Sequence, residues 1–259
     1  KILCKPLRQG NDAKTNQSIR WPSPRLLVMI IGSTVLLVMF TLFKSTSSFV
    51  YKACYRNIRP SRLFSSFFSD LSWKDVGITD ASLLERLNQA NLNVPTTIQA
   101  ASCQQILNSP EDATIGAETG SGKTLAYLVP LLQSQTDQRT LILEPNKELV
   151  NQVVRMASVL TDEPPSVIPG GLDAPVDWAP WRQEEALPFM ISTPASIQSW
   201  AWSPKHMDFF SQIQRVVLDE ADMLLDGGYL RPLQDVLMGF RRADRMAAKW
   251  EEESHRTHY

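Results

Sequence analysis

A glycine-rich stretch at residues 117–124 has the residue types that bind a phosphate chain. It reads Ala-Glu-Thr-Gly-Ser-Gly-Lys-Thr and lies between a short apolar run and a segment of helical periodicity. Gly120 and Gly122 allow the backbone to turn its amide N–H groups inward, and the following helix adds its positive N-terminal end. We expect Lys123 to reach the β- and γ-phosphates and the Thr124 hydroxyl to hold Mg²⁺. The stretch therefore predicts a site for a nucleoside triphosphate and its metal ion.

A group of acidic side chains follows an apolar run nearer the C-terminus. Residues 216–218 are Val-Val-Leu and lead directly into Asp219-Glu220-Ala221-Asp222. Alone, such a cluster most often forms a solvated loop. Hydrolysis of Mg²⁺·ATP, however, needs one carboxylate that fixes the metal through its waters and a second that deprotonates the attacking water. Together with the phosphate-binding stretch upstream, the cluster indicates an ATP-hydrolysing site.

Short apolar runs along the chain predict the strands that position these two groups. From Trp73 onward they alternate with helical patterns, which is typical of parallel βαβ units. Each run is short and largely apolar, as expected for a strand that is buried on both faces. The segment Asp162–Pro188 is rich in Pro, Gly and Trp and predicts mainly loop. The predicted strands are Ala113–Ala117, Thr140–Glu144, Ser166–Ile168, Phe189–Ser192 and Val216–Asp219.

Helical periodicity fills the intervals between these runs. In the fourth helix candidate, Leu149, Val153 and Leu160 recur on one face. Pro194 suits the first position of a helix, with Thr193 before it as the cap. The predicted helices are Asp80–Ala90, Thr97–Leu107, Lys123–Leu132, Lys147–Leu160 and Pro194–Trp200. The fold class is therefore α/β, with a mostly parallel sheet flanked by helices, and ligands of such sheets bind at the carboxyl ends of the strands.

The two parts of the chain carry opposite charge. Residues 1–69 hold 11 Lys/Arg and a single acid, whereas residues 70–259 hold 15 Lys/Arg and 26 Asp/Glu, so their formal charges are +10 and −11. A change this abrupt predicts a functional boundary near residue 70. Phosphate binding by the acidic part requires a local cluster of Lys/Arg. The three cysteines have no C-x-x-C spacing and no neighbouring His, which indicates neither a disulfide framework nor a zinc site.

The basic segment contains an uncharged stretch from Leu26 to Phe43. Because it is apolar on every face, we expect one helix about 27 Å long, near the lower limit for a membrane span. Residues 44–69 are basic and rich in serine, which is typical of an organelle transit peptide. The two together resemble plastid import signals, in which a signal peptide precedes a transit peptide. We expect a plastid or mitochondrial protein whose mature form starts near residue 50 to 70; the alternatives are a retained membrane anchor at residues 26–43 and a mispredicted gene start.

The acidic cluster and the glycine-rich stretch together resemble the DEAD-box ATP-dependent RNA helicases, in a match that extends from Trp73 to about Phe240. Residues 219–222 spell the Asp-Glu-Ala-Asp signature, and residues 94–99 resemble the adenine-reading motif with its glutamine at Gln99. The resemblance implies a RecA-like ATP-binding domain over residues 70–259 with ATP and Mg²⁺ as ligands. It makes Glu220 the catalytic base, with Asp219 positioning the metal, and Lys123 a catalytic phosphate ligand. The implied nucleotide-binding residues are Trp73, Thr97, Gln99, Ala117, Thr119, Gly120, Ser121, Gly122, Lys123, Thr124 and Asp222, with Thr124 and Asp219 holding Mg²⁺ through waters.

The resemblance also implies sequence-independent contacts to an RNA backbone. The residues at the matching positions are Pro145, Lys147, Gly171, Thr193 and Pro194. Two departures change these segments: Asn146-Lys147 replaces the usual Thr-Arg, and Ala195-Ser196 replaces the usual Gly-Arg. The second departure removes a guanidinium group that would fork onto phosphate, so we expect reduced RNA affinity.

The family's second RecA-like domain, which supplies arginine fingers, has no counterpart here, and residues 241–259 predict a charged helical tail. Since such an arginine is typically worth about 10³ to 10⁵ in rate, we expect this chain alone to bind ATP and hydrolyse it poorly. The leading interpretation is an RNA helicase lacking that domain. One alternative is a non-catalytic regulatory module that binds RNA and ATP, and another is a different phosphate-loop ATPase such as a transporter subunit.

Overall fold

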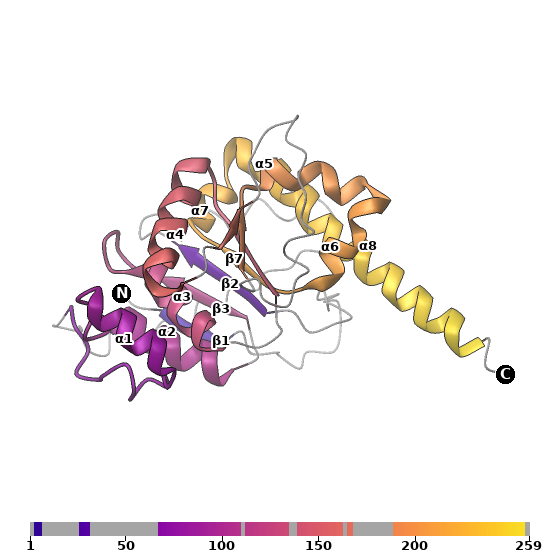
Figure 1. Cartoon of the computed structure of the whole chain (residues 1–259). Helices are drawn as coiled ribbons and strands as arrows, with labels where there is room; N and C mark the ends of the chain where they lie inside the picture. The colour runs from indigo at the N-terminus through magenta and orange to yellow at the C-terminus, as the bar shows by residue number, and fades with distance from the viewer. Residues whose placement is uncertain are drawn as a thin grey trace, which may run out of the picture.

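A single mixed sheet forms the centre of the molecule (Figure 1). The computed structural model describes residues 3–6, 26–31, 67–109, 112–134, 139–162, 165–167 and 189–256. Within these residues seven strands follow the order β1-β3-β2-β7-β4-β6-β5. Only β1 is antiparallel to its neighbour, and the other pairs are parallel. The strands are β1 (Leu3–Pro6), β2 (Leu26–Ile31), β3 (Ala113–Gly116), β4 (Arg139–Leu143), β5 (Ser166–Val167), β6 (Phe189–Ser192) and β7 (Ile213–Leu218).

Helices cover both faces of the sheet. The helices of the first half of the described chain are α1 (Ala81–Gln89), α2 (Thr97–Asn108), α3 (Lys123–Gln133) and α4 (Lys147–Leu160). Those of the second half are α5 (Pro194–Ile197), α6 (Met207–Gln212), α7 (Ala221–Leu224) and α8 (Gly227–Arg256), with the 3₁₀ helices η3 (Gln198–Trp202) and η4 (Pro204–His206). Figure 1 shows the end of α8 projecting beyond the rest of the molecule, where Trp250 is 70% exposed.

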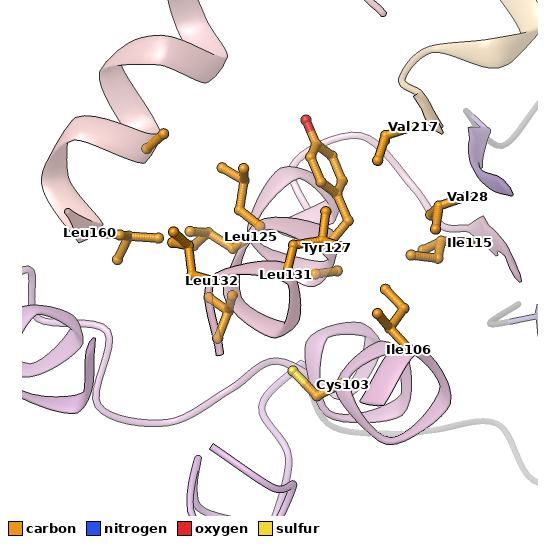
Figure 2. Close-up of a cluster of buried hydrophobic side chains, with 14 of the residues drawn as sticks. Val28, Cys103, Ile106, Ile115, Leu125, Tyr127, Leu131, Leu132, Leu160 and Val217 are labelled. Carbon is orange, nitrogen blue, oxygen red and sulfur yellow. The ribbon is translucent and has the colours of Figure 1, made fainter. Parts of the chain in front are cut away.

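Side chains of the strands β2, β4, β6 and β7 alternate between two hydrophobic cores. Along β7, Val217 belongs to the core beneath α1–α4, whereas Val216 and Leu218 belong to the core beneath α5–α8. Along β4, Ile142 lies in the first core and Leu141 in the second. Figure 2 shows part of the first core, where side chains of α2, α3 and α4 meet those of the sheet. Burial on both faces explains why residues 141–143 of β4 and 216–218 of β7 form continuous apolar runs instead of alternating with polar residues.

The predicted elements between Trp73 and Leu218 are largely confirmed. Lys147–Leu160 and Phe189–Ser192 have the predicted bounds, and most of the other elements differ by one or two residues at an end. β7 starts earlier than predicted, at Ile213, and the predicted helix Pro194–Trp200 divides into α5 and η3. Residues 241–256 of the helical tail that we expected form the second half of α8, which already begins at Gly227, and residues 257–259 lie outside the described part of the chain.

The expectation of a helix from Leu26 to Phe43 is wrong for its first six residues. Residues 26–31 form strand β2 inside the sheet, whereas residues 32–43 lie outside the described part of the chain. A run of six apolar residues with Val and two Ile fits a strand buried on both faces as well as it fits an apolar helix, and periodicity cannot distinguish the two. None of the described helices is both long and apolar enough to cross a membrane.

Candidate nucleotide-binding site

The carboxyl ends of three neighbouring strands meet at one edge of the sheet. The backbone N–H of Asp219, just after β7, donates to the carbonyl of Leu143 at 3.1 Å. The N–H of Glu144, just after β4, donates to the carbonyl of Ser192 at 2.9 Å. Because β3 runs parallel to the same strands through β2, its carboxyl end also points to this edge. The predicted phosphate-binding stretch and the predicted acids therefore lie at the same edge of the sheet, where the carboxyl ends of the strands meet.

The phosphate-binding stretch forms a loop between β3 and α3. Gly120 and Gly122 have φ angles of +81° and +86°, in the left-handed region that glycine adopts without strain. Lys123 is 8% exposed, and its Nζ donates to the carbonyl oxygens of Ala117 at 3.2 Å and Glu118 at 3.5 Å. The ammonium group is thus held over the loop, and bound phosphate oxygens would replace these carbonyls as its acceptors.

The start of α2 packs directly against this loop. Thr96 caps the helix, and Gln99 completes the capping box because its Oε1 accepts from the Thr96 N–H at 2.9 Å. The Thr96 hydroxyl also donates to the carbonyl of Ser121 at 3.1 Å, and Gln99 Nε2 donates to the carbonyl of Gly122 at 3.2 Å. A side-chain amide offers two donors and two acceptor positions, and these two bonds use one of each in Gln99. A Cβ atom at position 122 would lie against Gln99 Nε2, which is a second reason for glycine there.

The acid that follows β7 is buried in a network of hydrogen bonds. Asp219 is 5% exposed, and its Oδ2 accepts from the hydroxyl of Tyr127 at 2.9 Å, while its Oδ1 accepts from the Glu220 N–H at 2.9 Å. Burial raises the pKa of Asp219, and the hydrogen bond from Tyr127 acts in the opposite direction. Burial and the nearby charge of Asp219 also raise the pKa of Glu220, which favours proton uptake by this side chain.

Glu144, the residue after β4, adds a third carboxyl group to this edge. It is 1% exposed, it lies close enough to Asp219 for the two charges to interact, and its Oε1 is buried without a partner among the described residues. Burial and the negative charge of Asp219 raise the pKa of Glu144 to about 10. Because two adjacent carboxyl groups in a site with little water cannot both be ionised cheaply, Glu144 keeps a proton at neutral pH.

The side chains at this edge fit a magnesium ion held mainly through water and phosphate. Within the described ranges, no group of three or more His, Cys, Asp or Glu side chains is arranged to enclose a metal ion. Mg²⁺ commonly keeps several waters and takes only one or two carboxylates together with substrate phosphates, so Asp219 is a sufficient anchor. Ser121 Oγ and Asp222 Oδ1 are buried without a partner here, which leaves polar atoms available to such an assembly. Thr124, three positions after Ser121 in the first turn of α3, is partly buried.

Two of the predicted nucleotide-binding residues contact other parts of the chain through their side chains. The hydroxyl of Thr97 donates to the carbonyl of Phe67 at 3.4 Å, whereas its neighbour Thr96 contacts the phosphate loop. Trp73 is 3% exposed, and its indole N–H donates to the carbonyl of Leu92 at 2.6 Å. Its ring lines a cavity of about 320 Å³ together with Leu84 and other residues of α1, so its stacking on a base stays a prediction.

The predicted RNA-binding residues divide between two loops at the same edge. Lys147 is exposed at the start of α4, and Pro145 is buried in front of it. Thr193 is 7% exposed and caps α5, where its hydroxyl accepts from the Ser196 N–H at 3.3 Å, and Pro194 is buried. Gly171 lies outside the described residues. The loops after β4 and β6 are adjacent because those strands pair in the sheet.

Three residues of the site were missed from the sequence: Thr96, Tyr127 and Glu144. A signal existed for two of them. Thr96 is followed three positions later by Gln99, which is the spacing of a capping box. Glu144 is an acid at the end of a predicted buried strand, as Asp219 is. Tyr127 has no such signal, because an aromatic residue inside a helix next to a sheet is ordinarily a core residue.

A phosphate loop and a buried acid at the carboxyl edge of a parallel sheet define the class of phosphate-loop nucleotide-binding domains. The sequence profile of the DEAD/DEAH box helicase family matches residues 96–250, and the chain belongs to this family. It is 30% identical over 213 residues to DEAD-box ATP-dependent RNA helicase 22 of Oryza sativa, covering 72% of this chain and 36% of that protein. It is 31% identical over 205 residues to DEAD-box ATP-dependent RNA helicase 47, mitochondrial, of Arabidopsis thaliana, covering 69% of this chain and 35% of that protein.

Solved structures share the fold. The DEAD-box helicase Mss116 bound to ssRNA and UDP-BeF matches with a TM-score of 0.54 and 20% identity, over 65% of this chain and 37% of that one. The yeast DEAD-box splicing factor Prp28 matches with a TM-score of 0.51 and 22% identity, over 66% of this chain and 43% of that one. These similarities confirm the predicted RecA-like domain. The chain spans about a third of the length of the two plant relatives.

Proposed function

We propose that this chain is the ATP-binding part of an ATP-dependent RNA helicase, in which ATP binding and hydrolysis are coupled to RNA binding and duplex remodelling. The observation that carries the proposal is the juxtaposition, at one sheet edge, of the loop that holds Lys123 with the buried acid Asp219. Family membership supports the same activity, since both plant relatives are named ATP-dependent RNA helicases.

Each polar group at the edge has a role in this proposal. Backbone amides of the loop and Lys123 bind the phosphates, and Gln99 reads adenine with its remaining donor and acceptor. Thr124 and Asp219 hold Mg²⁺ through waters, and this ion supplies charge neutralisation on the phosphates when bound. Glu220 takes the proton of the attacking water, for which its raised pKa suits it. Asp222 links the site to the rest of the domain.

The loops after β4 and β6 are the proposed contact with RNA. They lie side by side at the edge that carries the nucleotide site, with Lys147 exposed on the first of them. Contacts of this kind bind the sugar-phosphate backbone without reading its sequence. The structures of Mss116 bound to ssRNA support RNA as the partner class. A second RecA-like domain acting across the cleft is part of the same proposal.

An organelle is the proposed location. The basic, serine-rich composition of residues 44–69 and the relative named mitochondrial support it. Cleavage near residue 50 to 70 is the expected fate of the N-terminal segment, with a membrane anchor at residues 26–43 as the alternative, and strand β2 weighs against both because its residues belong to the sheet.

A regulatory module that binds ATP and RNA without turnover is the second candidate. The observation that favours it is the replacement of two arginine positions by Lys147 and Ser196. Intact Lys123 and Glu220 favour the enzyme.

Measuring ATP hydrolysis by the whole chain distinguishes the enzyme from the regulatory module. We expect a labelled ATP analogue to bind, and Lys123→Ala to abolish binding. Phosphate release is expected to be slow and to rise with single-stranded RNA; Glu220→Gln should abolish it while keeping ATP binding. Glu85→Gln, at an exposed position of α1, is the matched control. RNA and ATP binding without any phosphate release would support the regulatory module, and absence of ATP binding would refute both.

A further inference from the structure

Strand β2 lies between the two strands that carry the halves of the nucleotide site. On one side it pairs with β3, with Ile31 opposite Gly116, the last residue before the phosphate loop. On the other side it pairs with β7, with Met29 opposite Leu218, the last residue before Asp219. The strand order places no direct pairing between β3 and β7. The N-terminal segment is thus inserted at the centre of the site that the rest of the chain builds.

The side chains of residues 28–30 in β2 pack on both faces of the sheet. Val28 and Ile30 are 0% exposed and belong to the core beneath α1–α4, and Met29 packs against the opposite core. In Figure 2 Val28 lies beside Ile115 of β3 and close to Val217 of β7. The alternation matches that of β4 and β7, so residues 28–30 complete both cores as an inner strand does.

One inner strand sets the separation of the strands on its two sides. Adjacent strands lie about 4.8 Å apart, so β2 holds β3 and β7 at about twice that spacing. The phosphate loop and the acids then lie on either side of the carboxyl end of β2. Without β2, β3 and β7 would either pair directly, which brings the loop closer to the acids, or separate and expose two unpaired edges. Neither arrangement keeps Lys123 and Asp219 at their present separation.

We propose that the N-terminal segment supplies the spacer strand of the ATP site, so that nucleotide binding by this chain depends on residues 26–31. The part of this inference that concerns ATP binding rests on the proposed function. The part that concerns the position of β2 in the sheet does not. It requires residues 26–31 to remain with the folded domain and excludes their use as a membrane anchor in the same molecule.

Amide hydrogen exchange of the unmodified chain tests the structural part. Inner strands open only in large unfolding events, so the amides of residues 28–31 should exchange as slowly as those of residues 113–116 in β3. The measurement is made in buffer and repeated with phospholipid vesicles. Fast exchange in buffer, or protection that requires vesicles, would overturn the proposal. The outcome does not depend on whether the chain hydrolyses ATP.

Val28→Asp tests the functional part, with Val159→Asp as its matched control. The first places a carboxyl group at a fully buried position, whereas Val159 is 51% exposed on α4 and outside both cores. If the binding-competent population falls to about 1%, the apparent affinity for a labelled ATP analogue falls about 100-fold. We expect that loss for Val28→Asp and an unchanged affinity for Val159→Asp.

The milder variant Ile30→Ala is included because loss of binding in Val28→Asp could result from failure of that variant to fold. It removes buried methyl groups from β2 without adding a polar atom, so we expect a lower melting temperature that ATP raises again, as for any ligand that binds the folded state. Wild-type affinity in Val28→Asp would overturn the proposal. An unmodified chain that protects β2 from exchange but binds no ATP would refute the proposed function and leave the inner strand established.

Discussion

Glu144→Gln should stabilise the protein, and by an amount that grows with pH. An ordinary glutamic acid has a pKa near 4.5, whereas that of Glu144 is raised to about 10 in the folded chain. Between these two pKa values the folded state therefore holds a proton on Glu144 that the unfolded state has released. The contribution of Glu144 to stability is fully present below pH 4.5 and is lost as the pH rises towards 10. Glutamine has the same shape, carries no such proton, and still offers an N–H donor to Asp219.

The size of the effect follows from the interval between the two pKa values. Each pH unit within that interval costs the wild-type protein about 1.4 kcal/mol of free energy of unfolding. The variant should equal the wild type near pH 5 and exceed it by about 3 kcal/mol at pH 7. Because Glu144 is 1% exposed, solvent screening does not reduce this difference appreciably.

Urea denaturation at pH 5, 6, 7 and 8 measures the difference directly. The experiment is made without nucleotide or Mg²⁺, because a bound cation would compensate the negative charge of Asp219, which is one cause of the raised pKa of Glu144. Glu85→Gln, an exposed substitution of the same kind, should show no dependence of this difference on pH. Parallel stability curves for Glu144→Gln and wild type across the four pH values would show that Glu144 carries no extra proton, and would refute the reasoning.

Two further substitutions test the contacts that hold the site. Tyr127→Phe removes a buried donor to the carboxylate of Asp219, so the free energy of unfolding should fall by about 2 kcal/mol in urea denaturation and the affinity for Mg²⁺·ATP should decrease; unchanged values for both would contradict the assigned role of this hydrogen bond. Gly122→Ala combines a left-handed backbone, costing about 1–2 kcal/mol, with a Cβ placed against Gln99, and should abolish binding of a labelled ATP analogue. Gly116→Ala, where an added Cβ meets no atom within 4 Å, should keep that binding.

The fold of residues 73–218 could be predicted because local patterns and tertiary structure agree there. α4 has an apolar face, a side-chain cap at Asn146 and a length typical of helices, so its bounds could be given to the residue. β2 lacked such support. Its apolar run continues into further apolar residues, and its partners β3 and β7 lie far downstream in the chain. Only the pairing between distant segments identifies it as a strand.

The residues of the site could be predicted where their spacing is local. The turn of the phosphate loop fixes Gly120, Gly122 and Lys123 relative to one another within a few positions, and a motif records that geometry. Tyr127 acts differently, because it contacts an acid 92 positions away. Its role depends on how α3 packs over the sheet, which no nearby residue specifies.

Glu144 could not be assigned to the site from the sequence, because the sequence does not give the order of the strands in the sheet. In the sheet, β4 pairs directly with β7, and Leu143 lies opposite Leu218. The residues that follow these two positions are Glu144 and Asp219, so their carboxyl groups must lie close together once the register is known. Burial then forces one of the two groups to keep its proton. The buried acid pair is thus a consequence of topology acting on two residues that, taken singly, look like ordinary strand ends.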